Sequence, residues 1–365
     1  MTVDLRQLKI GYVPYSPAFD APGDRRRFVN YARQRGLDFE IADPAKSYDV
    51  VVLSERADIS VWSRYPKGQN GGRIVYDLID SYLAIPRTDL KGRLRGLAKF
   101  LARQSRYLQF DHWKAIEAMC RRADAVVCTT DEQKADIAPH CANVHIVLDI
   151  HSMVTRTSKQ DYAAHRPLRL VWEGLPQTLP SLAVIAPVLE KLQQRFPLEL
   201  HLVTDLEYRR YLGRYGKADT LRTAQGIFPN VQLHAWNETT CAEIISSCDI
   251  AVIPLDRNDP FVTGKPENKL LLLWRLGMPT VVSATPAYRR AMSAAGIDLA
   301  CADTEKWQQA LEQLAQDEAA RRHAGEAGRR FAEMQHGEMQ TLARWDAVLH
   351  SLFTHTPQAA STCAA

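Results

Sequence analysis

The sequence has 365 residues, of which 46% are hydrophobic and 24% are charged, and its formal net charge is +4. This composition excludes an intrinsically disordered or fibrous chain, and so small a net charge gives no indication of a nucleic-acid partner. Two domains are expected at this length, because a single hydrophobic core seldom grows past roughly 250–300 residues.

Cysteine spacing and hydropathy indicate the cellular compartment of the protein. The 7 cysteines are scattered, with no Cys-x-x-Cys pair, which favours reduced thiols over a disulfide framework or a zinc site. The first residues lack the apolar core of a signal peptide, and no run approaches ~18 uninterrupted apolar residues. We therefore expect a cytoplasmic protein that is at most peripheral to a membrane.

In the first half of the chain, short apolar runs alternate with helical patterns, which is typical of βαβ units in a parallel sheet. The predicted strands are residues 9–14, 38–42, 49–54, 59–62, 73–80, 125–130 and 144–149. The predicted helices are residues 24–35, 89–122 and 131–138. Runs such as DVVVLS lack polar alternation, which predicts strands covered on both faces. Residues 1–150 are therefore predicted to form a Rossmann-like domain.

A second series of the same kind follows a polar linker at residues 151–167. Its predicted strands are residues 168–174, 198–205, 231–236, 249–255, 279–284 and 297–302. Its predicted helices are residues 180–196, 238–247, 266–276, 286–295 and 304–316. The pattern predicts a second Rossmann-like domain over 168–335, a C-terminal helix over 336–353 that can pack back on the first domain, and a disordered tail over 354–365.

The predicted fold class is thus α/β, with two doubly wound domains in tandem facing a cleft. Ligands of such sheets bind at the carboxyl ends of the strands, so the loop after the predicted strand 249–255 is of interest. In it Gly264 gives backbone freedom, and Pro266 suits the first turn of a helix. With Lys265 and Lys269 beside the helix start, the segment predicts an anion site that matches a diphosphate. The alternative is a solvated loop before an amphipathic helix.

The residues of this region resemble a known signature. The runs CDIAVIPL (248–255) and ENKLLLLWRLGMPTVVS (267–283) resemble the donor-binding segment of GT-B glycosyltransferases, especially the retaining group with a C-terminal E-x7-E motif. LVWEGLP (170–176) resembles the first strand and turn of the same donor domain. The likeness covers about residues 168–335 well and residues 1–150 only in outline.

The resemblance implies transfer of a sugar from a nucleotide diphosphate sugar to a saccharide or lipid-linked acceptor, in surface polysaccharide or glycoconjugate biosynthesis. It implies no metal and no cofactor besides the donor substrate. The donor-binding residues that it implies are Gly174, Asp205, Trp236, Thr263, Gly264, Lys265, Asn268 and Lys269. Two other classes stay open: a sugar-nucleotide epimerase of similar fold, and an inactive protein that binds nucleotide sugars.

The chain departs from the family pattern at its acidic positions. The place of the second glutamate of the motif falls at Leu272. Asp259 and Glu267 have the spacing D-x7-E but stand five residues earlier, and they are the candidate catalytic pair. The arginine and lysine that follow the glycine turn in the family are absent after Gly174. The resemblance still favours a retaining mechanism.

Two features of the first half are candidate contacts to substrates. Arg25 and Arg26 follow the first strand and are candidates for a donor diphosphate or an anionic acceptor; the alternative is a solvent-exposed helix start capped by Asp24. Asp77 and Asp80 end a predicted strand, and Asp80 is the candidate general base if the enzyme inverts. The alternative for both carboxylates is a helix cap or a structural ion pair.

Residues 90–108 predict a basic amphipathic helix. Leu90, Leu94, Leu97, Leu101 and Leu108 share one face, and Arg95, Lys99, Arg103 and Arg106 fall on the opposite one. Such a helix is typical of an anionic membrane surface or of a dock for a polyanionic acceptor. The alternative is a domain helix whose apolar side lies in the core and whose basic face is solvated.

Overall fold

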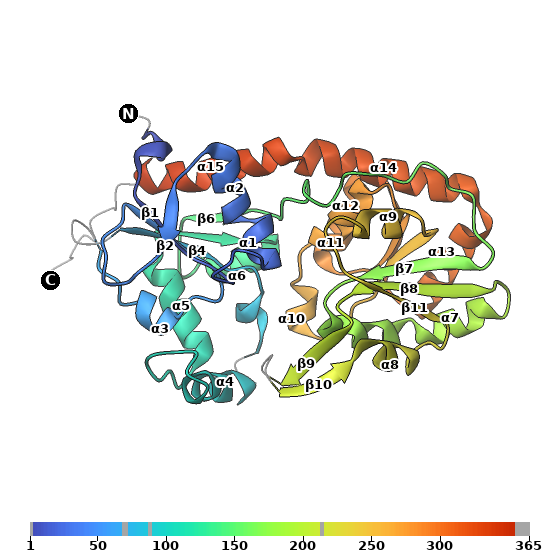
Figure 1. Cartoon of the computed structure of the whole chain (residues 1–365), viewed down its shortest axis with the longest axis horizontal. Coiled ribbons are helices and arrows are strands. Elements are labelled where there is room, and N and C mark those ends of the chain that lie inside the picture. The colour runs from blue at the N-terminus through green and yellow to red at the C-terminus, as the bar shows by residue number, and fades with distance from the viewer. Residues whose placement is uncertain (1–2, 68–71, 87–89, 212–214, 355–365) are drawn as a thin grey trace, which may run out of the picture. The chain divides into compact units, whose positions relative to one another are not determined.

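The computed structural model describes residues 3–67, 72–86, 90–211 and 215–354, so the predicted tail lies outside the described residues except for Thr354. The chain divides into two compact units (Figure 1). The first contains the residues up to Asp149 and those from Met339 on, and the second contains Ile150–Glu338.

The described part of the first unit has a 6-stranded parallel sheet in the order β2-β1-β3-β4-β5-β6. The strands are β1 (Ile10–Val13), β2 (Phe39–Ile41), β3 (Val50–Leu53), β4 (Arg73–Asp77), β5 (Ala125–Cys128) and β6 (Val144–Ile146). All residues of β3 and β5 are buried, as uninterrupted apolar runs predict. After β1 the chain forms β2 on one side of it, and then β3 on the other side. The pair β1–β3 is therefore the switch point of this sheet.

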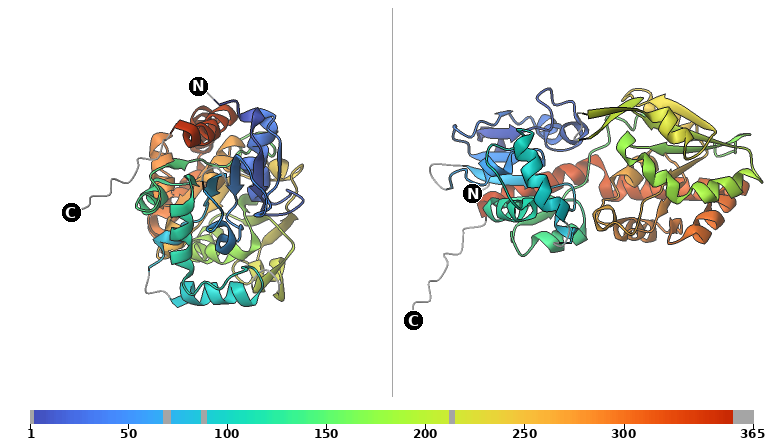
Figure 2. Two further views of the ribbon diagram at one scale, coloured as in Figure 1. Left: turned by 90° about the vertical axis from the view of Figure 1, so that its left-hand side faces the viewer. Right: turned by 90° about the horizontal axis from the view of Figure 1, so that it is seen from below.

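Helices cover both faces of this sheet (Figures 1 and 2). They are α1 (Pro22–Arg26), α2 (Phe28–Arg35), α3 (Ile59–Trp62), α4 (Leu90–Leu101), α5 (His112–Arg122), α6 (Asp131–Ile137) and α15 (Glu338–Thr354), with short 3-10 helices η1 (Leu5–Gln7) and η3 (Tyr82–Ala84). Trp62, Trp113 and Ile137 of α3, α5 and α6 share one core cluster with the sheet. Trp345 of α15 stacks on Tyr31 of α2, so the C-terminal helix packs on the first unit.

Three predicted elements of the first unit differ from the structure. The predicted helix 24–35 is interrupted at Arg27, which separates α1 from α2. Residues 59–62 form α3 and not a strand, because the Asp58 side chain accepts a hydrogen bond from the Ser60 N–H and caps a helix there. Residues 89–122 do not form one helix, because α4 ends at Leu101 and Arg103 then adopts a positive φ of 56°. The chain turns, and Asp111 caps α5.

The second unit has a 6-stranded parallel sheet in its described residues, in the order β11-β8-β7-β12-β13-β14. The strands are β7 (Leu168–Glu173), β8 (Leu198–Thr204), β11 (Val231–Ala235), β12 (Ile250–Ile253), β13 (Thr280–Ser283) and β14 (Ala300–Cys301). The chain direction across the sheet reverses between β7 and β12, which makes that pair the switch point. A separate antiparallel hairpin, β9 (Glu207–Tyr211) and β10 (Tyr215–Asp219), is not among the predicted strands.

The helices of the second unit include one at each predicted position. They are η4 (Pro176–Val184), α7 (Ala186–Gln193), α8 (Thr220–Gln225), α9 (Cys241–Ser246), α10 (Pro260–Thr263), α11 (Asn268–Arg275), α12 (Pro286–Ala294), α13 (Thr304–Gln316) and α14 (Glu318–His336), of which α8 and α10 are additional. The predicted helix 180–196 is split: a 3-10 turn that contains Pro180 precedes α7. The helix predicted from residue 266 begins at Asn268.

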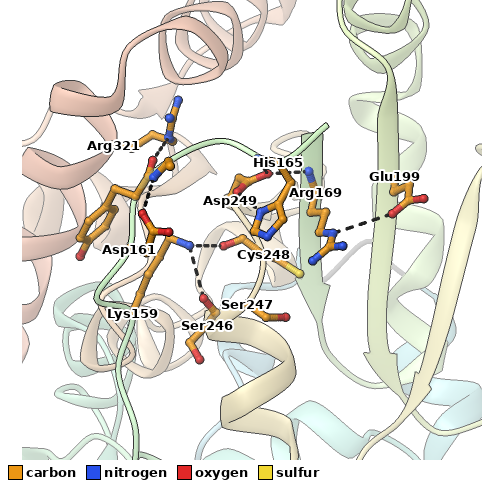
Figure 3. Close-up of polar contacts among 12 residues, drawn as sticks. Lys159, Asp161, His165, Arg169, Glu199, Ser246, Ser247, Cys248, Asp249 and Arg321 are labelled. Atoms are coloured by element: carbon orange, nitrogen blue, oxygen red, sulfur yellow. Dashed lines mark hydrogen bonds and ion pairs between the residues drawn. The ribbon is translucent and has the colours of Figure 1, made fainter. Parts of the chain in front are cut away.

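The linker after β6 is fixed to the second unit by buried polar groups. The fully buried carboxylate of Asp249 accepts hydrogen bonds from the backbone N–H of His165 and of Arg169, at 3.1 and 2.8 Å (Figure 3). Lys159 Nζ donates to the carbonyl of Cys248 at 2.7 Å. These groups lie where β7 and β12 begin, at the edge of the sheet opposite to the carboxyl ends.

A glycine contact in the second unit gives a prediction about stability. A Cβ on Gly325 of α14 would collide with the backbone carbonyl of Gly277, just after α11, and with the ring of Tyr162. Gly325→Ala should therefore lower the free energy of unfolding by roughly 1–3 kcal/mol, the range for an overpacked core. Urea unfolding measures it. The control is Gly226→Ala, whose added Cβ would meet its nearest neighbour at an ordinary 3.4 Å. Equal effects of the two changes would contradict the prediction.

Candidate functional site

The candidate site lies at the carboxyl edge of the second sheet, at the switch point between β7 and β12. Gly174 directly follows β7, and the segment from Pro254 to Glu267 connects β12 to α11. Doubly wound sheets bind ligands at this point, because the loops after the two strands diverge and leave a crevice. The predicted donor segment therefore has the position that such a site requires.

The structure brings two of the predicted donor residues together. Lys269 lies in the first turn of α11, and its Nζ is 2.5 Å from the place that a Cβ on Gly174 would take. The same Nζ is 4.9 Å from the centroid of the Trp172 ring, within the range of a cation–π contact. Because Gly174 has no side chain, the ammonium group can approach the turn after β7. A positive charge is thus held at the switch point.

Two acidic side chains lie within electrostatic reach of Tyr288 on α12. Glu173 ends β7 and is buried, and Glu267 immediately precedes α11 and is half-buried. Burial of Tyr288 on α12 raises the pKa of its hydroxyl, and the charges of Glu267 and Glu173 raise it further. The three side chains are therefore close enough to interact. The sequence prediction included Glu267 but missed Glu173, Tyr288 and the ring of Trp172; the position of Glu173 beside Gly174 was the signal for the first.

The predicted catalytic and donor-binding residues in the loop before α11 have different environments. Asp259 is exposed and caps α10 by accepting from the Phe261 N–H at 2.9 Å. Thr263 donates its hydroxyl to the carbonyl of Pro260, Gly264 ends α10, and Lys265 lies 5.9 Å from the centroid of the Phe261 ring. Asn268 is the first residue of α11.

The acidic positions of the family pattern separate by environment as well. Leu272, where the pattern has its second glutamate, is buried in the core. Asp259 acts as a helix cap, whereas Glu267 lies within electrostatic reach of Tyr288. Of the two candidate catalytic carboxylates, Glu267 is therefore the one within electrostatic reach of Tyr288, and it precedes Lys269 by two residues.

The neighbouring strand ends at the residues predicted to contact the nucleoside. Thr204 ends β8 and is buried, and its Oγ1 has no hydrogen-bond partner within the described part of the chain. Trp236 is half-buried, and its backbone N–H donates to the backbone carbonyl of Thr204 at 2.9 Å. Asp205 is exposed, and its carbonyl accepts from the hydroxyl of Thr220. Buried hydroxyl groups without a partner are rare in native proteins, and this one lies at a strand end where nucleoside contacts were predicted.

The candidate residues Arg25 and Arg26 of the first unit lie in α1, beside a turn that hydrogen bonds within the unit hold in place. Arg25 donates its Nε–H to the carbonyl of Asp20 at 2.8 Å, and Arg26 is half-buried. Asp24 does not cap the helix as the alternative expected, since it is buried and accepts from the hydroxyl of Tyr12 at 2.7 Å. Its carboxylate instead holds the turn after β1.

Asp77 and Asp80 differ in their surroundings. Asp77 is buried, and its two oxygens accept hydrogen bonds from the Arg27 guanidinium at 2.6 and 2.7 Å. Asp80 is half-buried, and its carbonyl accepts from the side-chain amide of Gln133. Asp77 therefore has the structural ion pair that was its alternative, and Asp80 stays a candidate base.

The predicted basic helix is oriented in a way that the sequence did not indicate. Leu94 and Leu101 of α4 are 65% and 72% exposed, and Leu97 is exposed too, so the apolar face does not lie in the core. Arg95 instead donates to the hydroxyl of Tyr82, and Lys99 Nζ lies 3.4 Å from Nε2 of His112. The alternative of a core-facing leucine stripe is wrong. The side chain of Leu90 lies outside the described part.

Arg103, Arg106 and Leu108 follow α4 and are not on the helix. The N–H of Arg106 donates to the Asp58 carboxylate at 2.7 Å, and the Tyr107 N–H donates to Ser60 Oγ, so α3 holds the returning segment. α4 packs closely against the returning segment at Gly96, because a Cβ on Gly96 would collide with the backbone carbonyl of Gln109.

Other kinds of site have little support among the described residues. In the described ranges, no three His, Cys, Asp or Glu side chains gather as a metal-ligand set, and no helix has the length and apolarity to cross a bilayer. A cavity of about 280 Å³ in the second unit is lined by linker residues, Arg275 and Arg329. None of the predicted site residues lines it, and it lies away from the carboxyl edge.

Two doubly wound α/β units of this kind define the GT-B fold of glycosyltransferases, and comparison with solved structures confirms the predicted fold class. HepE of Anabaena in complex with UDP has a TM-score of 0.62 at 10% identity, over 94% of this chain and 100% of HepE. WaaG, a glycosyltransferase involved in lipopolysaccharide biosynthesis, has a TM-score of 0.53 at 12% identity, over 93% and 99%.

TarM, known from S. aureus, has a TM-score of 0.56 at 10% identity over 82% of this chain and 54% of TarM, so the chain spans about half the length of that protein. At these identities the likeness establishes the fold and does not extend to the substrate. No protein-family model matches the sequence, and no curated protein matches it in sequence.

Proposed function

We propose that the chain is a glycosyltransferase that transfers a sugar from a nucleoside diphosphate sugar to a saccharide or lipid-linked acceptor, in glycoconjugate or surface polysaccharide biosynthesis. The observation that carries the proposal is the ammonium group of Lys269, held over Gly174 at the switch point of the second sheet. The UDP bound in the HepE and TarM structures supports a nucleoside diphosphate as the ligand class.

The chemistry follows from charge. When the glycosidic bond to the donor phosphate breaks, negative charge develops on the leaving diphosphate, and groups that stabilise this charge accelerate the step. Lys269 lies in the first turn of α11, where the helix dipole adds a partial positive charge, and Lys265 lies just before it. We propose that these groups do this without a metal ion. Glu267 is the proposed carboxylate for a retaining mechanism, and Asp80 the proposed base for an inverting one.

Lys269→Ala should weaken UDP binding by about 1–3 kcal/mol, the range for a lost charge-assisted hydrogen bond. Isothermal titration calorimetry with UDP measures the change. The matched control is Lys191→Ala, which removes an exposed lysine of α7 in the same unit and should leave the affinity unchanged. Equal UDP affinity of the wild type and Lys269→Ala would contradict the phosphate site. Release of UDP from a UDP-sugar, assayed with acceptor glycans, then tests the transfer itself.

We further propose that α4 attaches the protein to an anionic membrane surface, where a lipid-linked acceptor would be found. The exposed leucines of α4 support an apolar contact with lipid, and residues 90–110 contain no Asp or Glu. The protein would then be cytoplasmic and peripheral at the inner face of the plasma membrane. No feature of the described residues favours the epimerase or the inactive protein over transfer.

A further inference from the structure

The switch point of the first sheet has polar side chains that the proposed function has not yet used. Tyr15 follows β1, and Ser54 and Glu55 follow β3, the strand that pairs with β1 in parallel. The N–H of Ser54 donates to the carbonyl of Val13 at 3.1 Å, so the two segments stay side by side after the strands end. The three side chains therefore belong to one edge of one sheet, where ligands of such folds bind.

Each of these side chains has a buried polar atom without a hydrogen-bond partner among the described residues. The atoms are Tyr15 Oη, Ser54 Oγ and Glu55 Oε1, and Ser54 is 1% exposed as a residue. An unsatisfied buried polar group destabilises a fold, and native proteins contain few of them. Three at one switch point indicate groups that are satisfied by a ligand.

Charge limits what this ligand can be. Burial of Glu55 and the negative charge of Asp80 raise the pKa of the Glu55 carboxyl well above its usual range, although a hydrogen bond with Tyr82 opposes them. Asp77 is neutralised by its ion pair with Arg27. Lys99 of α4 lies within electrostatic reach of Glu55. An anionic ligand at this edge would be repelled by the negative charge of Asp80, whereas a neutral hydroxyl group would not be repelled.

We propose that Tyr15, Ser54 and Glu55 form a subsite for a neutral, hydroxyl-bearing sugar ring. A sugar hydroxyl both donates and accepts hydrogen bonds, so it can satisfy two hydroxyl groups and a carboxyl group together. The subsite rests on the proposed function, in which it holds the acceptor. It deepens that function by naming a neutral ring in place of the anionic acceptor considered for Arg25 and Arg26.

Saturation-transfer NMR tests the subsite on the full chain, with the methyl glycosides of glucose, galactose, mannose and N-acetylglucosamine as probes. At least one should bind, and Tyr15→Phe and Ser54→Ala should each weaken it about tenfold, because each removes one hydroxyl group that hydrogen-bonds to the ligand. If none of the four binds, or if neither variant changes the affinity, the proposal is overturned.

A matched pair of variants separates ligand binding from a structural role. The Tyr12 hydroxyl donates to Asp24, so Tyr12→Phe should lower the Tm. The Tyr15 hydroxyl has no partner in the described residues, so Tyr15→Phe should leave the Tm unchanged or raise it. An equal fall in Tm for both variants would assign the Tyr15 hydroxyl to the fold and overturn its role in binding.

UDP calorimetry on the same samples distinguishes the two proposals. UDP binding in the absence of any glycoside binding would overturn the subsite and leave the glycosyltransferase proposal standing. Glycoside binding that the variants weaken, in a protein that does not bind UDP, would support the subsite as a sugar site and overturn the proposed function.

Discussion

Arg27→Met is expected to lower the free energy of unfolding by about 3–5 kcal/mol, the range for removing one partner of a buried ion pair. Arg27 is fully buried, donates two hydrogen bonds to Asp77, and lies 3.0 Å from Asp149. Methionine fills much of the same volume but leaves the carboxylate of Asp77 buried without a counter-charge. Urea unfolding at neutral pH measures the loss.

The effect should depend on pH. Burial already raises the pKa of Asp77, and Arg27 opposes this rise. Without Arg27 the pKa rises further, so the folded variant binds a proton that the unfolded chain releases above pH ~4. The stability of the variant therefore falls as the pH rises, and the loss relative to wild type should shrink on acidification towards pH ~4.

Two controls separate charge from packing. Arg26→Met removes the neighbouring half-buried arginine and should have little effect. Arg27→Met combined with Asp77→Leu removes both charges and should recover part of the loss, because apolar residues of similar volume often replace a buried pair without penalty. A single variant as stable as the wild type, or a double variant less stable than the single one, would contradict this account.

Most strands of both sheets could be predicted, because buried parallel strands have uninterrupted apolar sequences, such as those of β3 and β12. The failures come from short segments. The run ISVW has the same composition as a strand, and only the cap by Asp58 makes it helical. The first strand of the hairpin β9–β10 has the sequence EYRRY. Its apolar and charged residues do not alternate strictly, so the sequence lacks the period of two that indicates a half-buried strand.

The candidate site was predictable in outline, because the glycine turn and the helix start are local features of the sequence. The meeting of Lys269 with Gly174 depends on β7 and β12 being neighbours, and the βαβ rhythm does not fix strand order. The same limit explains why Glu173 and Tyr288 were missed. For the same reason the sequence did not single out Glu55, whose environment depends on β1, β3 and β4 being neighbours.

The orientation of α4 was the least predictable feature, since a helical period shows two faces and does not say which one packs on the protein. Leu94→Glu combined with Leu101→Glu should abolish binding to vesicles that contain anionic phospholipid. Both leucines are exposed, and each loses up to about 1.5–3 kcal/mol of apolar transfer when a charge replaces it. Co-sedimentation with anionic vesicles at low salt measures the binding, and neutral vesicles provide the comparison.

The control must add the same charge elsewhere, so Met334→Glu with Met339→Glu is suitable, because both methionines are 67% exposed on other helices. That variant should still bind, which shows that the loss comes from α4 and not from two extra negative charges. The basic residues of 90–110 add about 1 kcal/mol each where they reach the lipid surface, and salt screens this part. Raising the salt should therefore weaken the binding of the wild type. If the leucine variant co-sediments as well as the control does, the exposed face of α4 is not a lipid contact, and the acceptor is to be sought among soluble glycans.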